Sequence, residues 1–63
     1  MMIHILLENR KDFEKLKKFP IEGFEIISSQ FKKPNHTLVI AEADEDSAAL
    51  VRLMFGSSNV WER

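Results

Sequence analysis

His4 and Glu42 are the residues whose types and positions could support acid–base chemistry. His4 interrupts the apolar run Met2–Leu7, and Glu42 lies near the end of a second apolar run, Thr37–Ala43. If the two runs are neighbouring strands, both side chains could lie on one sheet face, where a partly closed cavity would tune them for proton transfer. The pattern therefore predicts a candidate catalytic pair that depends on strand register. The alternative is a strand histidine with a backbone partner and a glutamate solvated at the strand end.

The acidic triplet Asp44-Glu45-Asp46 is a second group that could do chemistry, as a metal site. Asp44 directly follows an apolar strand pattern, and the residues after it repeat at helical spacing up to Gly56. An N-cap aspartate with further acids in the first turn stabilises a helix without any ligand. A calcium loop would require oxygen ligands at alternate positions, a glycine at the bend and a distal glutamate. The sequence therefore predicts a helix start here and no metal site.

Cofactor chemistry has little support in the composition. The chain contains no cysteine, so it can form neither a disulfide nor a thiolate site for zinc. Only two glycines are present, Gly23 and Gly56, and they are too far apart to form a glycine-rich phosphate loop. We therefore expect neither a metal nor an organic cofactor.

A chain of 63 residues is expected to form one small domain with a limited core. Such a domain buries only about 60% of the surface that its unfolded chain exposes. Good packing or oligomerisation must provide the missing stability, and we expect oligomerisation. The apolar start MMIHILL ends at Glu8, too early for a signal-peptide core or a membrane span. The sequence predicts a soluble, cytoplasmic protein without a membrane partner.

The net charge of −1 hides an uneven distribution of charged residues. Residues 1–33 contain seven basic and five acidic residues, whereas residues 34–63 contain two basic and five acidic ones. A basic half could follow phosphates, but a nucleic-acid domain usually has a much stronger positive balance on one face. We therefore interpret these lysines as the solvated face of a helix and do not expect a nucleic-acid partner.

The first half of the chain predicts a strand, a helix and a second strand. Met2–Leu7 has the length and composition of a central strand. Asn9 can cap a short amphipathic helix that Pro20 ends. Gly23 then leads into FEIISSQF, whose aromatic and isoleucine content favours a strand. The apolar positions of the predicted helix are Phe13, Leu16 and Phe19.

The second half predicts a hairpin, a helix and a last strand. The turn Lys33–His36 combines a proline that presets φ with an asparagine that favours turns, so the chain should reverse into TLVIAEA. The helix that follows Asp44 should end at Gly56, and NVWER should form the final strand. The residues expected on the buried side of this helix are Leu50, Val51, Met54 and Phe55.

This order of elements predicts an α+β fold of the ferredoxin-like type, βαββαβ, with residues 1–63 as a single domain. In that fold, the first and third strands are neighbours at the centre of a four-stranded antiparallel sheet. Right-handed crossovers place the two helices on one face of the sheet. The other sheet face is left without a cover.

The uncovered sheet face is expected to be apolar. If the odd-numbered residues of Met2–Leu7 pack under the helices, the even-numbered ones point the other way, because side chains alternate along a strand. Trp61 is either core beneath the second helix or an anchor at a subunit contact. An apolar patch on so small a chain marks an interface, and a second copy is its simplest cover. In the third strand, the outward pair is either Leu38 with Ile40 or Val39 with Ala41. The candidate ligand-binding or interface residues are Met2, Leu6, Leu38, Ile40 and Trp61.

The last 27 residues, TLVIAEADEDSAALVRLMFGSSNVWER, resemble the C-terminal half of GYD-domain proteins and related dimeric α/β-barrel proteins. The shared features are an apolar strand ending in Glu-Ala, an acidic helix start, an alanine-rich helix, a Gly-Ser turn and a last strand beginning Asn-Val. The Gly-Tyr-Asp triplet of that family is absent, with Pro34-Asn35-His36 near the corresponding place, and the relatives continue their last strand beyond the position of Arg63. The resemblance implies the fold and dimerisation but little chemistry, because the wider fold hosts monooxygenases, isomerases and effector-sensing domains.

Three hypotheses of function follow. The first is a small module, structural or ligand-binding, that forms a homodimer or higher homo-oligomer through the open sheet face and could hold a small apolar ligand. The second is a cofactor-free enzyme of the dimeric α/β-barrel type, with His4 and Glu42 as acid and base in a cavity between the sheets. The third is a nucleic-acid binder with RRM-like topology, although the strands lack the paired exposed aromatics that stack bases.

Overall fold

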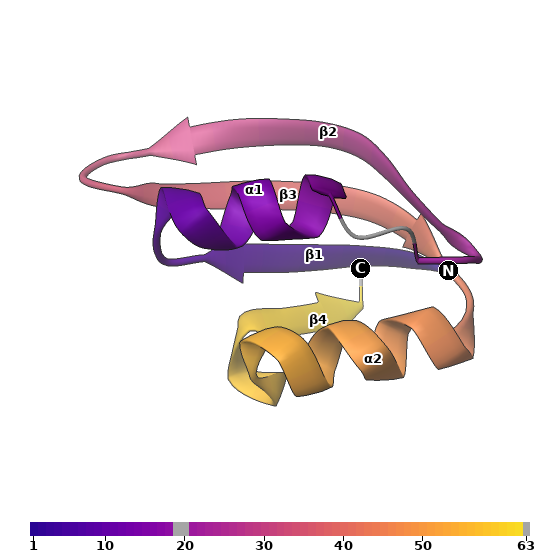
Figure 1. Ribbon diagram of the computed structural model, residues 1–63. Coiled ribbons are helices and arrows are strands. Elements are labelled where there is room, and N and C mark those ends of the chain that lie inside the picture. The colour runs from indigo at the N-terminus through magenta and orange to yellow at the C-terminus, as the bar shows by residue number, and fades with distance from the viewer. Residues whose placement is uncertain (19–20, 63) are drawn as a thin grey trace.

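The computed structural model describes residues 1–18 and 21–62, which form a four-stranded sheet and a layer of two helices (Figure 1). Neither helix in this part of the chain is long and apolar enough to cross a membrane. The strands are β1, Met2–Leu7; β2, Phe24–Lys32; β3, His36–Ala43; and β4, Val60–Glu62. The helices are α1, Arg10–Lys18, and α2, Glu45–Phe55, and a short 3-10 helix, η1, Ser57–Asn59, precedes β4.

The sheet has the order β2-β3-β1-β4, and each neighbouring pair of strands is antiparallel. Both helices lie on the same face of the sheet (Figure 1). This arrangement confirms the predicted ferredoxin-like fold. The last strand is shorter than the predicted segment NVWER, because Asn59 belongs to η1. Arg63 lies outside the described residues.

The core lies between the sheet and the helices and follows the alternation of the two central strands. The odd-numbered residues of β1 are buried, as the sequence predicts, and so are Val39 and Ala41 of β3. Leu38 and Ile40 therefore lie on the open face, because neighbouring strand residues point to opposite sides. The buried apolar residues are Ile3, Ile5, Leu7, Leu16, Val39, Ala41, Ala43, Ala48, Val51 and Val60.

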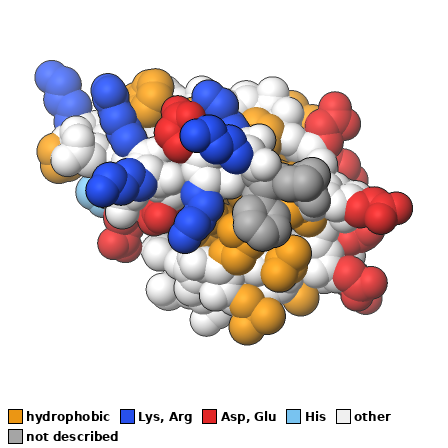
Figure 2. Space-filling view, in the orientation of Figure 1, with side chains coloured by type: hydrophobic (Ala, Val, Ile, Leu, Met, Phe, Trp, Pro, Cys, Tyr) orange, Lys and Arg blue, Asp and Glu red, His pale blue; other side chains and the backbone are white. Residues whose placement is uncertain are grey.

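Charged residues are segregated along the strand direction (Figure 2). Lysines and arginines gather over α1 and the β2–β3 hairpin, whereas most of the carboxylates visible in this view lie at the opposite end. At that end, Gly23 lies against the start of α2, where its carbonyl accepts a 3.0 Å hydrogen bond from the N–H of Asp44. The molecule therefore has a basic end and an acidic end, although its net charge is only −1.

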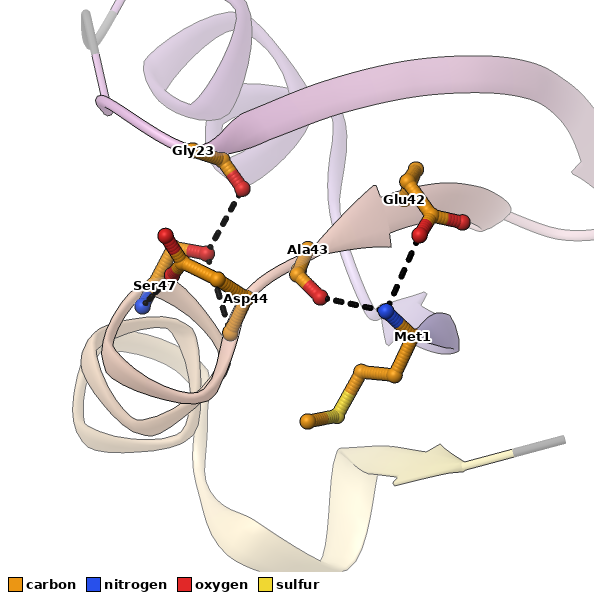
Figure 3. Close-up of polar contacts among 6 residues, drawn as sticks. All are labelled: Met1, Gly23, Glu42, Ala43, Asp44 and Ser47. Atoms are coloured by element: carbon orange, nitrogen blue, oxygen red, sulfur yellow. Dashed lines mark hydrogen bonds and ion pairs between the residues drawn. The ribbon is translucent and has the colours of Figure 1, made fainter.

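Both helices begin at the predicted caps. Asn9 Oδ1 accepts a hydrogen bond of 2.9 Å from the backbone N–H of Asp12. Asp44 Oδ1 accepts one of 2.8 Å from the backbone N–H of Ser47 (Figure 3), and this bond lowers the pKa of Asp44 below its ordinary value of 3.8. The predicted end of the first helix at Pro20, together with its apolar position Phe19, lies outside the described residues.

The buried side of α2 differs in part from the predicted one. Leu50, expected on the buried side, is 40% exposed. Val51 is buried and Phe55 packs against the core, as predicted. Ser47 and Ala48 are also buried, because small side chains in the first turns let the helix approach the sheet along that side and turn Leu50 outward. As predicted, the helix ends at Gly56, whose φ of +92° only glycine adopts readily.

We expect Asp44→Ala to lower the melting temperature by roughly 4–8 °C, the shift that loss of one helix cap brings in a domain of this size. Because the folded-state pKa of Asp44 is lowered, stabilisation by the ionised cap is present above pH 3.8 and is lost as the pH falls through the lower folded value. The difference in melting temperature between wild type and Asp44→Ala should therefore shrink below pH 3.8. Thermal melts followed by circular dichroism measure it.

Metal addition is the control for this prediction. A helix cap needs no ion, so EDTA, calcium and magnesium should each leave the melting temperature of the wild type unchanged. A calcium- or magnesium-dependent rise of several degrees that disappears in Asp44→Ala would contradict the interpretation of the acidic triplet as a helix start.

β2 and β3 form the predicted hairpin, and β2 contains a bulge that the sequence pattern does not reveal. The pairing shifts between Ile26 and Ser28, so that Ile27 has no partner residue in β3. One extra residue reverses the face of each side chain that follows it in the strand. Phe31 consequently pairs with the buried Thr37 and lies on the helix side of the sheet.

Candidate functional site

The open face of the sheet carries an apolar cluster, which we call the open-face cluster. The register places His4 opposite Ile40 of β3 and opposite Trp61 of β4. Residues directly opposite each other in antiparallel strands share a face, and Leu6 lies opposite Leu38 on the same face. The open-face cluster consists of Met2, Leu6, Leu38, Ile40 and Trp61 around His4. The structure therefore brings the predicted interface residues together on one surface.

His4 lies at the centre of the open-face cluster, in apolar surroundings. The centroid of its ring is 5.5 Å from that of Trp61, with the two ring planes inclined at 41°. His4 Nε2 is buried, and no group in residues 1–18 and 21–62 forms a hydrogen bond with it. A buried polar atom without a partner costs roughly 1–3 kcal/mol. His4 Nε2 is therefore a buried nitrogen whose hydrogen bond is not made within the described residues.

Glu42 lies on the same face as His4 but is engaged elsewhere. It pairs with Met2 in the register, one step along the face from the pair of His4 and Ile40. The N-terminal ammonium of Met1 donates to Glu42 Oε1 at 2.9 Å and to the carbonyl oxygen of Ala43 at 2.8 Å (Figure 3). Within the described chain, no hydrogen bond joins His4 to Glu42. The catalytic role of this pair stays a prediction.

Trp61 lies on the open face and not beneath α2. Its side chain is 41% exposed and stacks at an angle on His4. The alternative in which this indole belongs to the core under the second helix is therefore wrong. Its role as an anchor at a subunit contact stays a prediction.

The β2 edge of the open face is polar and carries opposite charges at its two ends. Glu25 lies opposite Glu42 at one end, and Lys32 lies opposite His36 at the other. Ser28, which follows the bulge, lies opposite Ile40 between them. An apolar centre bordered by polar and charged residues is the usual composition of a protein interface.

The described residues contain no group of three or more His, Cys, Asp or Glu side chains that could hold a metal ion. In the acidic triplet, the Asp44 carboxylate accepts the hydrogen bond from Ser47 that caps α2. Glu45 and Asp46 are exposed in the first turn of that helix. The triplet therefore acts as a helix start in this structure.

A pocket at the basic end was not predicted from the sequence. It lies between the first turn of α1 and the β2–β3 hairpin, and Arg10 and Phe31 are among the residues that line it. The count of basic residues in the first half of the chain indicated a positive surface. The bulge at Ile27, which turns Phe31 towards α1, has no clear signal in the sequence.

Comparison with protein-family models, with curated proteins and with solved structures finds no match to this chain. The resemblance of residues 37–63 to the GYD-domain proteins therefore stays a prediction. The fold and the open-face cluster are the observations from which a function can be argued.

Proposed function

We propose that the protein is a small homodimeric module whose two copies pair through their open sheet faces and hold a small apolar ligand between them. The observation that carries this proposal is the open-face cluster with the buried, unpartnered Nε2 of His4 at its centre. A second copy would cover the apolar side chains, and a ligand between the sheets would supply the missing hydrogen bond.

The composition of the open face supports pairing. An antiparallel sheet with one face in water usually carries polar side chains on that face, whereas the outward residues at the centre of this sheet are Leu6, Leu38 and Ile40. Large contiguous apolar patches are rare on monomeric proteins. Burial of further apolar surface in an interface also adds a larger share of stability to a domain of 63 residues than to a large domain, because the core of the small domain is small.

The charges at the edge of the face favour a second copy of this chain as the cover. Glu25 and Glu42 lie at one end of the β2–β3 pair, and Lys32 and His36 lie at the other. A twofold axis that runs across the strands reverses their direction, so the acidic end of one copy faces the basic end of the other. The same surface is then complementary to itself in charge, as an isologous interface requires.

The ligand half of the proposal depends on His4. Pockets for small ligands are mostly apolar and contain a few polar groups that fix the orientation of the ligand. The open-face cluster has this composition, since one buried imidazole nitrogen lies among Leu, Ile, Met and Trp side chains. A small apolar molecule with one hydroxyl or carbonyl group would match it.

Sedimentation equilibrium tests the dimer directly. At high micromolar concentration, we expect a particle of twice the 7.3 kDa mass of one chain. The melting temperature should fall on dilution, because association of two folded chains stabilises the folded state by an amount that depends on protein concentration. Trp61 is the only tryptophan, so its emission should shift to longer wavelength as the chains separate. A particle of 7.3 kDa at high micromolar concentration, with an emission independent of concentration, would overturn the proposal.

A further inference from the structure

We propose that the pocket between α1 and the β2–β3 hairpin, which we call the hairpin pocket, binds a small ligand that combines an aromatic ring with a phosphate group. The pocket has a volume of about 290 Å³, close to the lower end of the range for small-molecule sites. It lies at the basic end of the molecule and shares Lys32 and His36 with the charged edge of the open face. Its lining residues are Arg10, Phe31, Lys32, Lys33, Pro34, Asn35 and His36.

The charge of the lining favours a phosphate. Arg10, Lys32 and Lys33 contribute three positive charges, and no Asp or Glu lines the pocket. None of these three side chains forms an ion pair with another residue of the described chain. An incoming anion would therefore displace no carboxylate. A dianion matches three cations better than a singly charged carboxylate does, and Arg can hold two phosphate oxygens at once.

Phe31 provides the surface for an aromatic ring. It is 62% exposed. The guanidinium of Arg10 lies 5.3 Å from the centre of the Phe31 ring, and Phe13 packs against it edge to face with centroids 6.2 Å apart. The ring is therefore fixed in orientation and still accessible. A flat ligand ring can stack on such a side chain, as nucleic-acid bases do on exposed aromatic residues.

The bulge in β2 is what builds the hairpin pocket. Glu25 lies on the open face, so regular alternation would have placed Phe31 there too. The unpaired Ile27 reverses the alternation, and Phe31 lies instead on the helix side beside Arg10. Bulges commonly redirect a side chain next to a functional site. The aromatic surface and the cations are brought together by this one extra residue.

A titration of the protein with phenyl phosphate, followed by amide chemical shifts at low ionic strength, tests the proposal. We expect saturable shifts at residues 10, 31–33, 35 and 36, which are the pocket residues that have an amide N–H. Inorganic phosphate should bind at the same residues about tenfold more weakly, because it lacks the ring that stacks on Phe31. Shifts spread over all the lysines of α1, or phenyl phosphate binding no tighter than inorganic phosphate, would overturn the proposal.

Matched variants separate the pocket from general attraction to a basic surface. Lys33→Gln and Arg10→Gln should each weaken phenyl phosphate binding about tenfold, because each removes a charge-assisted contact. Lys15→Gln removes the same charge from α1 outside the pocket and should change the affinity less than twofold. Phe31→Leu should abolish the preference for phenyl phosphate over inorganic phosphate. Equal losses in Lys33→Gln and Lys15→Gln, or binding of single-stranded RNA without binding of phenyl phosphate, would contradict the assignment.

Discussion

Leu6→Lys should convert the protein from a dimer into a monomer. Leu6 lies on the open face opposite Leu38, in the middle of the proposed interface. A buried ammonium without a partner is unfavourable by several kcal/mol, and the twofold axis brings the substitution into the interface twice. A cost of about 3 kcal/mol already weakens dimerisation roughly a hundredfold. Sedimentation equilibrium at micromolar concentrations measures this change as a fall in mass towards 7.3 kDa.

Leu53→Lys is the matched control for this prediction. It makes the same chemical change on α2, where Leu53 is 84% exposed and lies on the other side of the molecule from the open face. We expect the mass of Leu53→Lys to equal that of the wild type. The fold should persist in Leu6→Lys as well, because a lysine can extend its ammonium into water once the partner has left. If Leu6→Lys formed a dimer with the same affinity as the wild type, the interface would not include the open face around Leu6.

The fold could be predicted because its main determinants are local in the sequence. The alternation of β1 and the caps Asn9 and Asp44 are each visible in a few neighbouring residues. The order of elements then allows only a few arrangements, since crossovers have a preferred hand. Leu50 was misplaced because the helical period alone does not show that the buried stripe would follow the small residues Ser47 and Ala48.

The open-face cluster could be predicted in outline, but its details depend on contacts between distant residues. The register of β1 and β3 decides that Leu38 and Ile40 face outward. The partner of Glu42 is the N-terminal ammonium of Met1, which no motif indicates. The bulge at Ile27 arises from the pairing of β2 with β3. No residue type in that part of β2 signals a bulge. These features are set by tertiary structure, and sequence periodicity does not report them.

Gly23→Ala should destabilise the protein more than Gly56→Ala does. Gly23 has a φ of +80°, which costs an L-residue about 1–2 kcal/mol. An added Cβ would also collide with the exposed Asp44 carboxylate, whose Cγ would lie only 2.7 Å away. That side chain would have to move and give up its cap of α2, at a further cost of about 1 kcal/mol. A core of this size rarely supplies more than about 3–5 kcal/mol. Urea denaturation should therefore show a population of unfolded Gly23→Ala already without denaturant.

A double-mutant cycle with Asp44→Ala separates the two causes of this loss. The three heavy atoms nearest to the added Cβ all belong to the Asp44 carboxylate, so removing it relieves the collision and leaves the backbone strain. Gly23→Ala should then cost clearly less in Asp44→Ala than in wild type. Gly56→Ala is the control, because its φ is +92° but its nearest contact would be Asn59 Nδ2 at 3.9 Å, so its cost should be the same in both backgrounds. An equal cost of Gly23→Ala with and without the carboxylate would contradict the tight packing of the turn before β2 against the start of α2.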